Sequence, residues 1–153
     1  MRLNLKNKKI TVVGLGKSGF AAAKFLNARK AVVRVTESGR KNEALENAGY
    51  LRTLGVEVET GGHTEGFISG ADWVVTSPGV PRSSPSLAWA RQKNIPVISE
   101  VELAYLVCKG TLVAVTGSNG KTTTCHLIYR ILQSAGRKSV LCGNVGRDRK
   151  SVV

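Results

Sequence analysis

One segment near the amino terminus restricts the folds open to this chain more than any other: a short apolar run that leads directly into a glycine-rich turn. The run is Ile10–Val13, a helical pattern follows at 18–27, and a second apolar run follows at 32–35. The turn has the spacing G-x-G-x-x-G, with its glycines at Gly14, Gly16 and Gly19. Glycines at this spacing permit a tight turn and a close approach of the backbone to a phosphate. The segment therefore predicts a β-α-β unit with two parallel strands.

Short strands and helices alternate further along the chain. We expect strands at 56–59, 73–76 and 96–99, and helices at 43–54, 85–92 and 100–107. This alternation predicts an α/β fold with a parallel sheet. With 153 residues, of which 42% are hydrophobic and 22% charged, the chain is long enough to bury a core and does not have the composition of a disordered protein.

A second unit is expected to begin near Lys109. Its predicted elements are a strand at 111–116, a helix at 121–135 and a strand at 139–142. Two strands and one helix are too few to enclose a core, so we expect 109–146 to be the start of a truncated domain. Residues 147–153 are expected to be a non-native or disordered tail, because Asp148–Val153 matches one translation of a widely used sequencing-adapter oligonucleotide; an ordinary basic tail is the alternative.

Composition and cysteine count exclude several classes of protein. No apolar run approaches the roughly 20 residues of a membrane-spanning helix, and the amino terminus has no signal-peptide pattern. We therefore expect a cytoplasmic protein without a membrane partner. The three cysteines are an odd count and include no C-x-x-C pair, which argues against a disulfide framework and against a zinc site.

The net charge of +13 is the unusual bulk property of the sequence. Such a charge favours nucleic acid, an acidic small molecule or merely a solvated surface. The basic residues are scattered, and no aromatic side chains are interleaved with them as stacking platforms for a single strand. A basic nucleic-acid-binding module is kept as an alternative, but no nucleic-acid partner is expected.

Glu37 stands at the end of the second predicted strand, about 20 positions beyond the glycine-rich turn, where an acidic side chain can accept a hydrogen bond from a ribose or a base. The alternative is that the glycines serve only close packing of helix on strand. The turn does not identify the nucleotide, so an NAD-linked oxidoreductase is a competing function, although the sequence shows no catalytic His or Tyr arrangement for it. His63, which follows Gly61 and Gly62, is expected in a solvated loop, and the alternative is that it approaches the ligand.

The second glycine-rich loop, Thr116–Thr123, lies between a predicted strand and a predicted helix. It is a shortened relative of the P-loop, because Val115 stands where the general pattern has a glycine. The backbone amides of Gly117–Lys121 can surround an anion. Lys121 is expected to reach the β- and γ-phosphates of ATP, and the Thr122 hydroxyl to ligate Mg²⁺.

With its two glycine-rich loops in this order along the chain, the sequence resembles the Mur ligases, which are ATP-dependent amide ligases of peptidoglycan precursor synthesis. Besides the two glycine-rich loops, the stretches that carry the resemblance are Ser77–Pro81, Ile98–Leu103 and Gly143–Gly146. The resemblance extends over roughly residues 5 to 146, which is far more specific than any one motif. The first loop and Ser77–Pro81 are most similar to the members that add D-glutamate.

The resemblance implies a Rossmann-like UDP-sugar-binding domain over 1–108 and the truncated start of a P-loop ATP-binding α/β domain over 109–146. It implies that the full-length enzyme joins D-glutamate to UDP-N-acetylmuramoyl-L-alanine, with ATP and Mg²⁺, as a monomer. The chain alone is expected to be inactive, because the further metal ligands and third domain of the family would lie beyond Val153.

The resemblance also implies a role for individual residues, carried over by position. Lys121 would be catalytic, and the ATP-binding residues would be Gly117, Ser118, Asn119, Gly120, Lys121, Thr122 and Thr123. The substrate-binding residues would be Leu15, Gly16, Lys17, Ser18, Glu37, Ser38, Ser77, Pro78, Gly79 and Asn144. The family often has an arginine directly after the positions of Glu37 and Ser38, whereas here Gly39 intervenes before Arg40.

Overall fold

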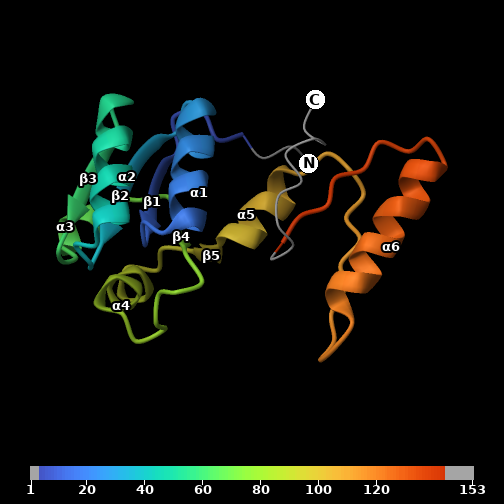
Figure 1. Cartoon of the computed structure of the whole chain (residues 1–153). Coiled ribbons are helices and arrows are strands. Elements are labelled where there is room, and N and C mark those ends of the chain that lie inside the picture. The colour runs from blue at the N-terminus through green and yellow to red at the C-terminus, as the bar shows by residue number, and fades with distance from the viewer. Residues whose placement is uncertain (1–3, 144–153) are drawn as a thin grey trace. The chain divides into compact units, whose positions relative to one another are not determined.

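The computed structural model describes residues 4–143 (Figure 1). The chain divides into two compact units between Lys109 and Gly110, and each is described by itself. We call the part up to Lys109 unit 1 and the part from Gly110 unit 2. Within the described range, no helix has both the length and the apolar character needed to span a membrane.

Unit 1 is built on a five-stranded sheet with the order β3-β2-β1-β4-β5, in which every neighbouring pair is parallel. The strands are β1 (Lys9–Val13), β2 (Val32–Glu37), β3 (Glu57–Thr60), β4 (Trp73–Thr76) and β5 (Val97–Ser99). In register, Val12 on the central strand stands opposite Val35 on one side and Val75 on the other. The chain adds strands on one side of β1 and then crosses to the other, so the order reverses between β1 and β4. Such a reversal leaves a crevice at the carboxyl ends of the strands.

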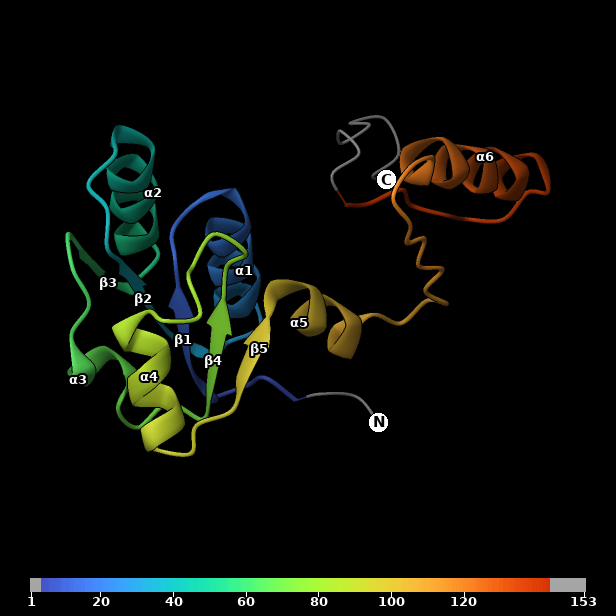
Figure 2. The same ribbon diagram turned by 90° about the horizontal axis from the view of Figure 1, so that it is seen from below.

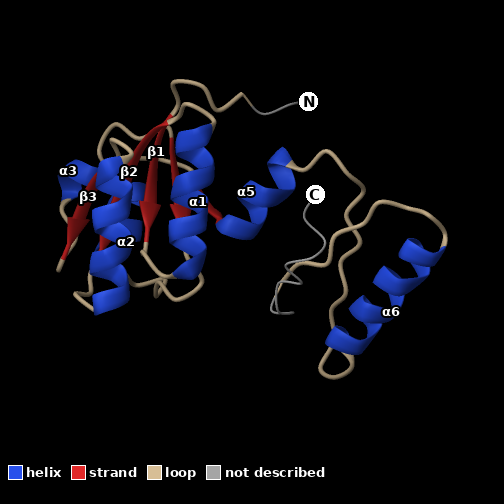
Figure 3. Ribbon diagram, turned by 45° about the horizontal axis from the view of Figure 1, so that its top comes forward, coloured by secondary structure: helices blue, strands red, loops and turns tan. Residues whose placement is uncertain are grey.

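Helices cover both faces of this sheet. They are α1 (Lys17–Ala28), α2 (Asn42–Thr53), α3 (Glu65–Ile68), α4 (Pro85–Gln92) and α5 (Glu100–Val107). Figure 2 shows the strands between α1 and α4, and Figure 3 shows α1 and α2 side by side on one face. The strands are short apolar runs because both of their faces are buried.

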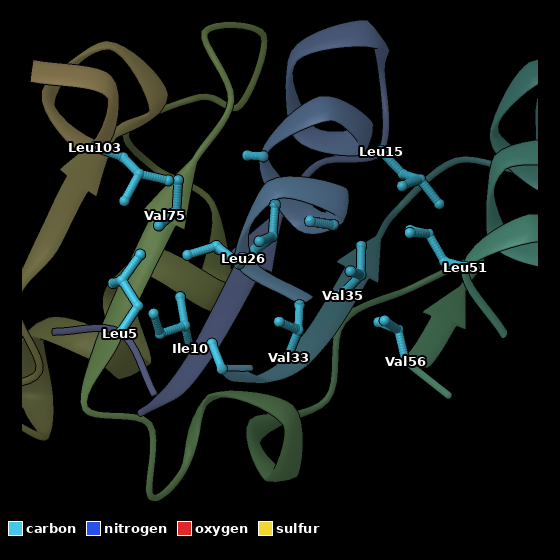
Figure 4. Close-up of a cluster of buried hydrophobic side chains, with 14 of the residues drawn as sticks. Leu5, Ile10, Leu15, Leu26, Val33, Val35, Leu51, Val56, Val75 and Leu103 are labelled. Carbon is cyan, nitrogen blue, oxygen red and sulfur yellow. The ribbon is translucent and has the colours of Figure 1, made fainter. Parts of the chain in front are cut away.

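Two hydrophobic clusters follow from this layering. Leu26 of α1, Leu51 of α2 and Leu103 of α5 pack on Ile10, Val12, Val35 and Val75 of the strands (Figure 4). On the other face, Ile68 of α3 and Leu87 and Ala90 of α4 pack on Val13 and Val74. Successive β1 residues alternate between the faces, as a strand requires.

The elements predicted for unit 1 are confirmed, with end points that differ by one to a few residues. The short helix α3 was not predicted. It is a single turn whose Phe67 carbonyl accepts a hydrogen bond from the buried Thr11 hydroxyl, 2.6 Å away. A helix this short has too few residues to show a periodic apolar pattern.

Unit 2 contains one described helix, α6 (Lys121–Ser134), close to its predicted range. The strands predicted at 111–116 and 139–142 are wrong: both segments are loop (Figure 3). Leu112, Val113 and Val140 are 52%, 59% and 66% exposed, and α6 has no buried residue. An apolar run becomes a strand only where another strand accepts its hydrogen bonds. No sheet forms among the described residues of this unit, so the runs remain unpaired.

The amino end of α5 leads to a first prediction: Ser99→Ala lowers the free energy of unfolding of unit 1 by about 1 kcal/mol. The Glu102 backbone N–H donates to Ser99 Oγ at 3.1 Å, and the Ser99 N–H donates to Glu102 Oε2 at 2.7 Å. Denaturant unfolding measures the loss. Val101→Ala, in the same helix at a 67% exposed position, is the control and changes stability by less than about 0.5 kcal/mol.

The capping contribution depends on pH in a defined direction. Hydrogen bonds from the Ser99 backbone N–H and hydroxyl lower the pKa of Glu102, against a smaller opposing effect of burial. A lowered folded-state pKa means that the contribution is present at neutral pH and disappears as the pH falls through that value. In acid the stability difference between wild type and Ser99→Ala should become smaller without vanishing, because the Ser99 hydroxyl loses its carboxylate acceptor while the Glu102 backbone N–H still donates to Ser99 Oγ; a difference that grew in acid would contradict the capping role.

Candidate nucleotide-binding site

A cavity of about 790 Å³ lies at the carboxyl ends of the strands of unit 1, where the strand order reverses. Five chain segments line it: the turn after β1, the end of β2, Glu43 at the start of α2, the loop between β3 and α3, and the loop between β4 and α4. We call the last two the β3–α3 loop and the β4–α4 loop. A crevice at this place is where open parallel sheets bind nucleotides and other ligands.

The glycine-rich turn has a geometry that only glycine permits at two positions. Gly14 has a φ of +95°, and its N–H donates to the Thr36 carbonyl at 2.9 Å. A Cβ on Gly19 would lie 1.9 Å from the Gly14 carbonyl oxygen, so α1 contacts the turn directly. Gly16 forms the start of α1 with open space around it, and no side chain caps this helix. The first amides of α1 are therefore available to an anion.

The Glu37 carboxylate lies across the same turn. Its Oε2 accepts from the Leu15 N–H at 2.6 Å, and its Oε1 accepts from the Gly39 N–H at 2.7 Å. Burial by itself raises the pKa of Glu37, but the two backbone N–H groups, the Ser38 hydroxyl and the His63 imidazole together outweigh it and lower the pKa. At neutral pH the cavity thus holds a fixed, ionised acceptor.

His63 lies in a loop, as predicted, but the loop borders the cavity, which agrees with the alternative that this residue approaches the ligand. The residue is half-buried and lines the cavity. Its Nδ1 lies 2.6 Å from Oγ1 of Thr36, which has no exposed surface. The Gly61 and Gly62 N–H groups donate to the Glu37 carbonyl at 2.9 and 3.3 Å, which holds the β3–α3 loop over the end of β2. Its position in the sequence points to the site: His63 follows β3, which pairs with β2 in parallel, so both strands end at the same edge of the sheet.

The β4–α4 loop is joined to the turn by hydrogen bonds. The Ser77 N–H donates to the Val13 carbonyl at 3.0 Å, and Ser77 Oγ donates to the Gly14 carbonyl at 3.3 Å. Ser77, Pro78 and Gly79 therefore line the cavity from the side opposite β2.

The second glycine-rich loop lies in unit 2 and forms the start of α6. Gly120 has a left-handed conformation, with φ +77°, and is the residue before the helix. The Lys121 ammonium donates to the carbonyls of Gly117 and Ser118, the latter at 3.1 Å, so the side chain folds back on its own loop. The Thr122 side chain is on the exposed surface. These residues form a loop of exposed amides, one ammonium and several hydroxyls, that of Thr122 among them, a set of groups that suits a phosphate and its cation.

The regions that contain the two glycine-rich loops each match a known protein family. Residues 8–99, more than half of the chain, match the family described as Mur ligase MurD-like, N-terminal domain. The chain belongs to the Mur ligase family. Residues 115–151 match a second description, Mur ligase middle domain.

Relatives of this Mur ligase chain share one name. A UDP-N-acetylmuramoylalanine–D-glutamate ligase of Koribacter versatilis is 46% identical over 94% of the chain, and one of Streptococcus pneumoniae is 43% identical over 96%. The matched region is only 32% and 33% of those two proteins, so the chain spans about a third of their length.

Solved structures agree on the fold. The MurC structure of Thermotoga maritima, a UDP-N-acetylmuramate–alanine ligase, gives a TM-score of 0.57 at 26% identity, over 84% of this chain and 30% of that one. A murein peptide ligase of Psychrobacter arcticus gives 0.58 at 20% identity, over 93% and 31%, and supports the fold alone.

The structure of this Mur ligase chain brings most of the expected substrate-site residues together. Around the cavity of unit 1 lie Gly16, Lys17, Ser18, Glu37, Ser38, Ser77, Pro78 and Gly79. The Leu15 side chain is fully buried in the core, so only its backbone faces Glu37. Asn144 lies outside the described residues. Arg40 packs beside Gly61, where a Cβ would lie 2.1 Å from its Nε. In the described range no cluster of three or more His, Cys, Asp or Glu side chains could hold a metal ion.

Proposed function

We propose that this chain is part of an ATP-dependent ligase that joins D-glutamate to UDP-N-acetylmuramoyl-L-alanine in the cytoplasm. The observation that carries the proposal is the cavity of unit 1, in which the uncapped start of α1, an ionised acceptor at Glu37 and the β4–α4 loop lie at one sheet edge. The names of the similar proteins support the choice of substrates. The ligase activity is proposed for the whole protein, because the chain spans about a third of those relatives.

The cavity suggests how the UDP-sugar lies. The diphosphate binds at the open amides of Gly16, Lys17 and Ser18, where the positive end of α1 favours an anion. The uridine then extends toward Glu37 and Ser38 at the end of β2. The muramoyl group extends the other way, toward Ser77–Gly79, and Asn144 would also contact the substrate.

In unit 2 we propose that Gly117–Thr123 bind ATP, with Lys121 as the catalytic residue. The open amides and free-standing hydroxyl of this loop fit a nucleotide triphosphate with Mg²⁺. Thr122 would hold the ion, which supplies Lewis-acid stabilisation of phosphate charge. Lys121 must leave its loop carbonyls to reach the phosphates, and there its ammonium stabilises the charge that develops on the transferred group.

The reaction requires an activated carboxylate. The alanyl carboxylate attacks the γ-phosphorus, ADP leaves, and an acyl phosphate forms. The D-glutamate amine then attacks the acyl carbon, and the tetrahedral intermediate releases inorganic phosphate as the amide forms and the amine loses its proton. Both steps place negative charge on oxygens, which is why cationic groups are needed at this site.

A thermal-shift titration of the 153-residue chain tests the substrate assignment. UDP-N-acetylmuramoyl-L-alanine should raise the melting temperature of unit 1, because a ligand that binds only the folded state stabilises it by about 2.7 kcal/mol at 100 times its Kd. NAD⁺ is the comparison ligand and should give no shift. A shift with NAD⁺ alone would assign the glycine-rich turn to a dinucleotide and overturn the proposal.

A further inference from the structure

We propose that His63 binds the uracil base of the ligand and, with Glu37, selects uracil against cytosine. The inference rests on the proposed function, which supplies a UDP-sugar as the ligand. It concerns a residue that lines the cavity at the end of β2 and β3 and that has no role in the binding and transfer steps described above.

The tautomer of His63 follows from its buried partner. Thr36 Oγ1 lies 2.6 Å from Nδ1 of the imidazole and is sealed from solvent. A buried hydroxyl needs an acceptor for its hydrogen, and the neutral ring nitrogen provides one. When the hydroxyl donates to Nδ1, the ring hydrogen is on Nε2. Within residues 4–143 no protein group forms a hydrogen bond with Nε2, which lies on the ring edge away from Thr36, so this N–H is available to a ligand.

A fixed acceptor lines the same cavity as His63. It is the carboxylate of Glu37, whose backbone carbonyl accepts the N–H groups of Gly61 and Gly62 in the loop that carries His63. Its Oε2 accepts from the Leu15 N–H and keeps a further lone pair, whereas its Oε1 accepts from both the Gly39 N–H and the Ser38 hydroxyl. The two side chains therefore present one donor and one acceptor to the cavity. Thr36 holds the imidazole of His63, and the N–H groups of Leu15 and Gly39 hold the carboxylate of Glu37.

This pair matches one edge of uracil. Uracil has an N–H at N3 beside a carbonyl oxygen, so the carboxylate can accept from N3 while Nε2 donates to the carbonyl. Cytosine has an acceptor at N3 and an amino donor at C4, so for a base held in the same position by its ribose and diphosphate both interactions would be mismatched. His63 belongs to the loop after β3, two strands away from β1 and the turn that starts α1, which favours the base over the diphosphate as its partner.

Two substitutions at one position separate ligand binding from loop support. Asparagine places its amide near the position of Nδ1 and lacks an atom at Nε2, whereas glutamine can place its amide near Nε2. We would measure the Kd of UDP and of CDP by calorimetry for wild type, His63→Asn and His63→Gln in the 153-residue chain. His126→Asn, on the exposed surface of α6, is the matched control. The melting temperature of each variant reports whether unit 1 is folded.

The expected result is that His63→Asn weakens UDP binding about tenfold and narrows the UDP-to-CDP preference, while His63→Gln and His126→Asn retain most of both. If His63→Asn keeps UDP affinity and His63→Gln loses it, the residue acts only by supporting the loop through Thr36, and the proposal is overturned. An equal loss in both variants with unchanged base preference overturns it as well. If wild type binds neither UDP nor UDP-N-acetylmuramoyl-L-alanine, the proposed function fails too, which is a different and recognisable outcome.

Discussion

Replacing Gly19 by alanine should lower the free energy of unfolding of unit 1 by about 3 kcal/mol. A Cβ at this position would lie 1.9 Å from the Gly14 carbonyl oxygen and 2.7 Å from Ser77 Oγ. The first of these is a backbone atom, so no rotamer change relieves the overlap. Either α1 must move away from the turn, or the turn must move away from β4.

Both movements would disturb the same hydrogen bonds. The Gly14 N–H donates to Thr36, and its carbonyl accepts from Ser77, so the turn is held on two sides. We therefore expect weaker UDP-sugar binding together with the lost stability. Urea or guanidinium unfolding of the 153-residue chain measures the loss of stability, and calorimetry measures the weaker UDP-sugar binding.

Gly49→Ala is the matched control, because it makes the same change in the neighbouring helix α2. No atom lies within 4 Å of a Cβ built there. Alanine is the better helix former, so this variant should gain about 0.5–1 kcal/mol. If Gly19→Ala and Gly49→Ala had the same effect, the close contact between α1 and the turn would not exist.

Replacing Glu37 by glutamine should weaken UDP binding about tenfold or more at neutral pH. The carboxylate accepts from Leu15 and Gly39 with its two oxygens, whereas an amide has one oxygen and must turn its NH₂ toward one of those N–H groups. The acceptor offered to the ligand is then misplaced. Calorimetry with UDP measures the effect, and Glu46→Gln on the exposed surface of α2 is the control.

The stability difference between wild type and Glu37→Gln should depend on pH. Although burial opposes ionisation, the backbone donors lower the pKa of Glu37 below its ordinary value. The contribution of the carboxylate is therefore present above the unfolded-state pKa and is lost as the pH falls through the folded-state value. Since the group is partly exposed, about 1 kcal/mol is expected at neutral pH, vanishing in acid. A difference that grew in acid would mean that Glu37 is neutral in the folded protein.

Local sequence determined much of unit 1. Its strands are short apolar runs, its helices follow from apolar periodicity, and the turn at 14–19 is set by glycines that allow a positive φ and a close helix. These are properties of neighbouring residues, so they can be predicted without knowing what lies across the molecule. The same holds for Glu37, whose position at a strand end is fixed by the length of the β-α-β unit.

Tertiary structure alone decided which distant residues meet. Thr36 and His63 are 27 positions apart, and Gly14 and Ser77 are 63 apart, yet each pair is joined by a hydrogen bond because parallel strands end at the same sheet edge. It also decided the structure of 111–116 and 139–142, whose apolar runs look like strands but find no strand to pair with among residues 4–143. A hydrophobic pattern states that a segment can be buried; only a neighbouring strand or helix supplies the surface and hydrogen-bond partners that bury it.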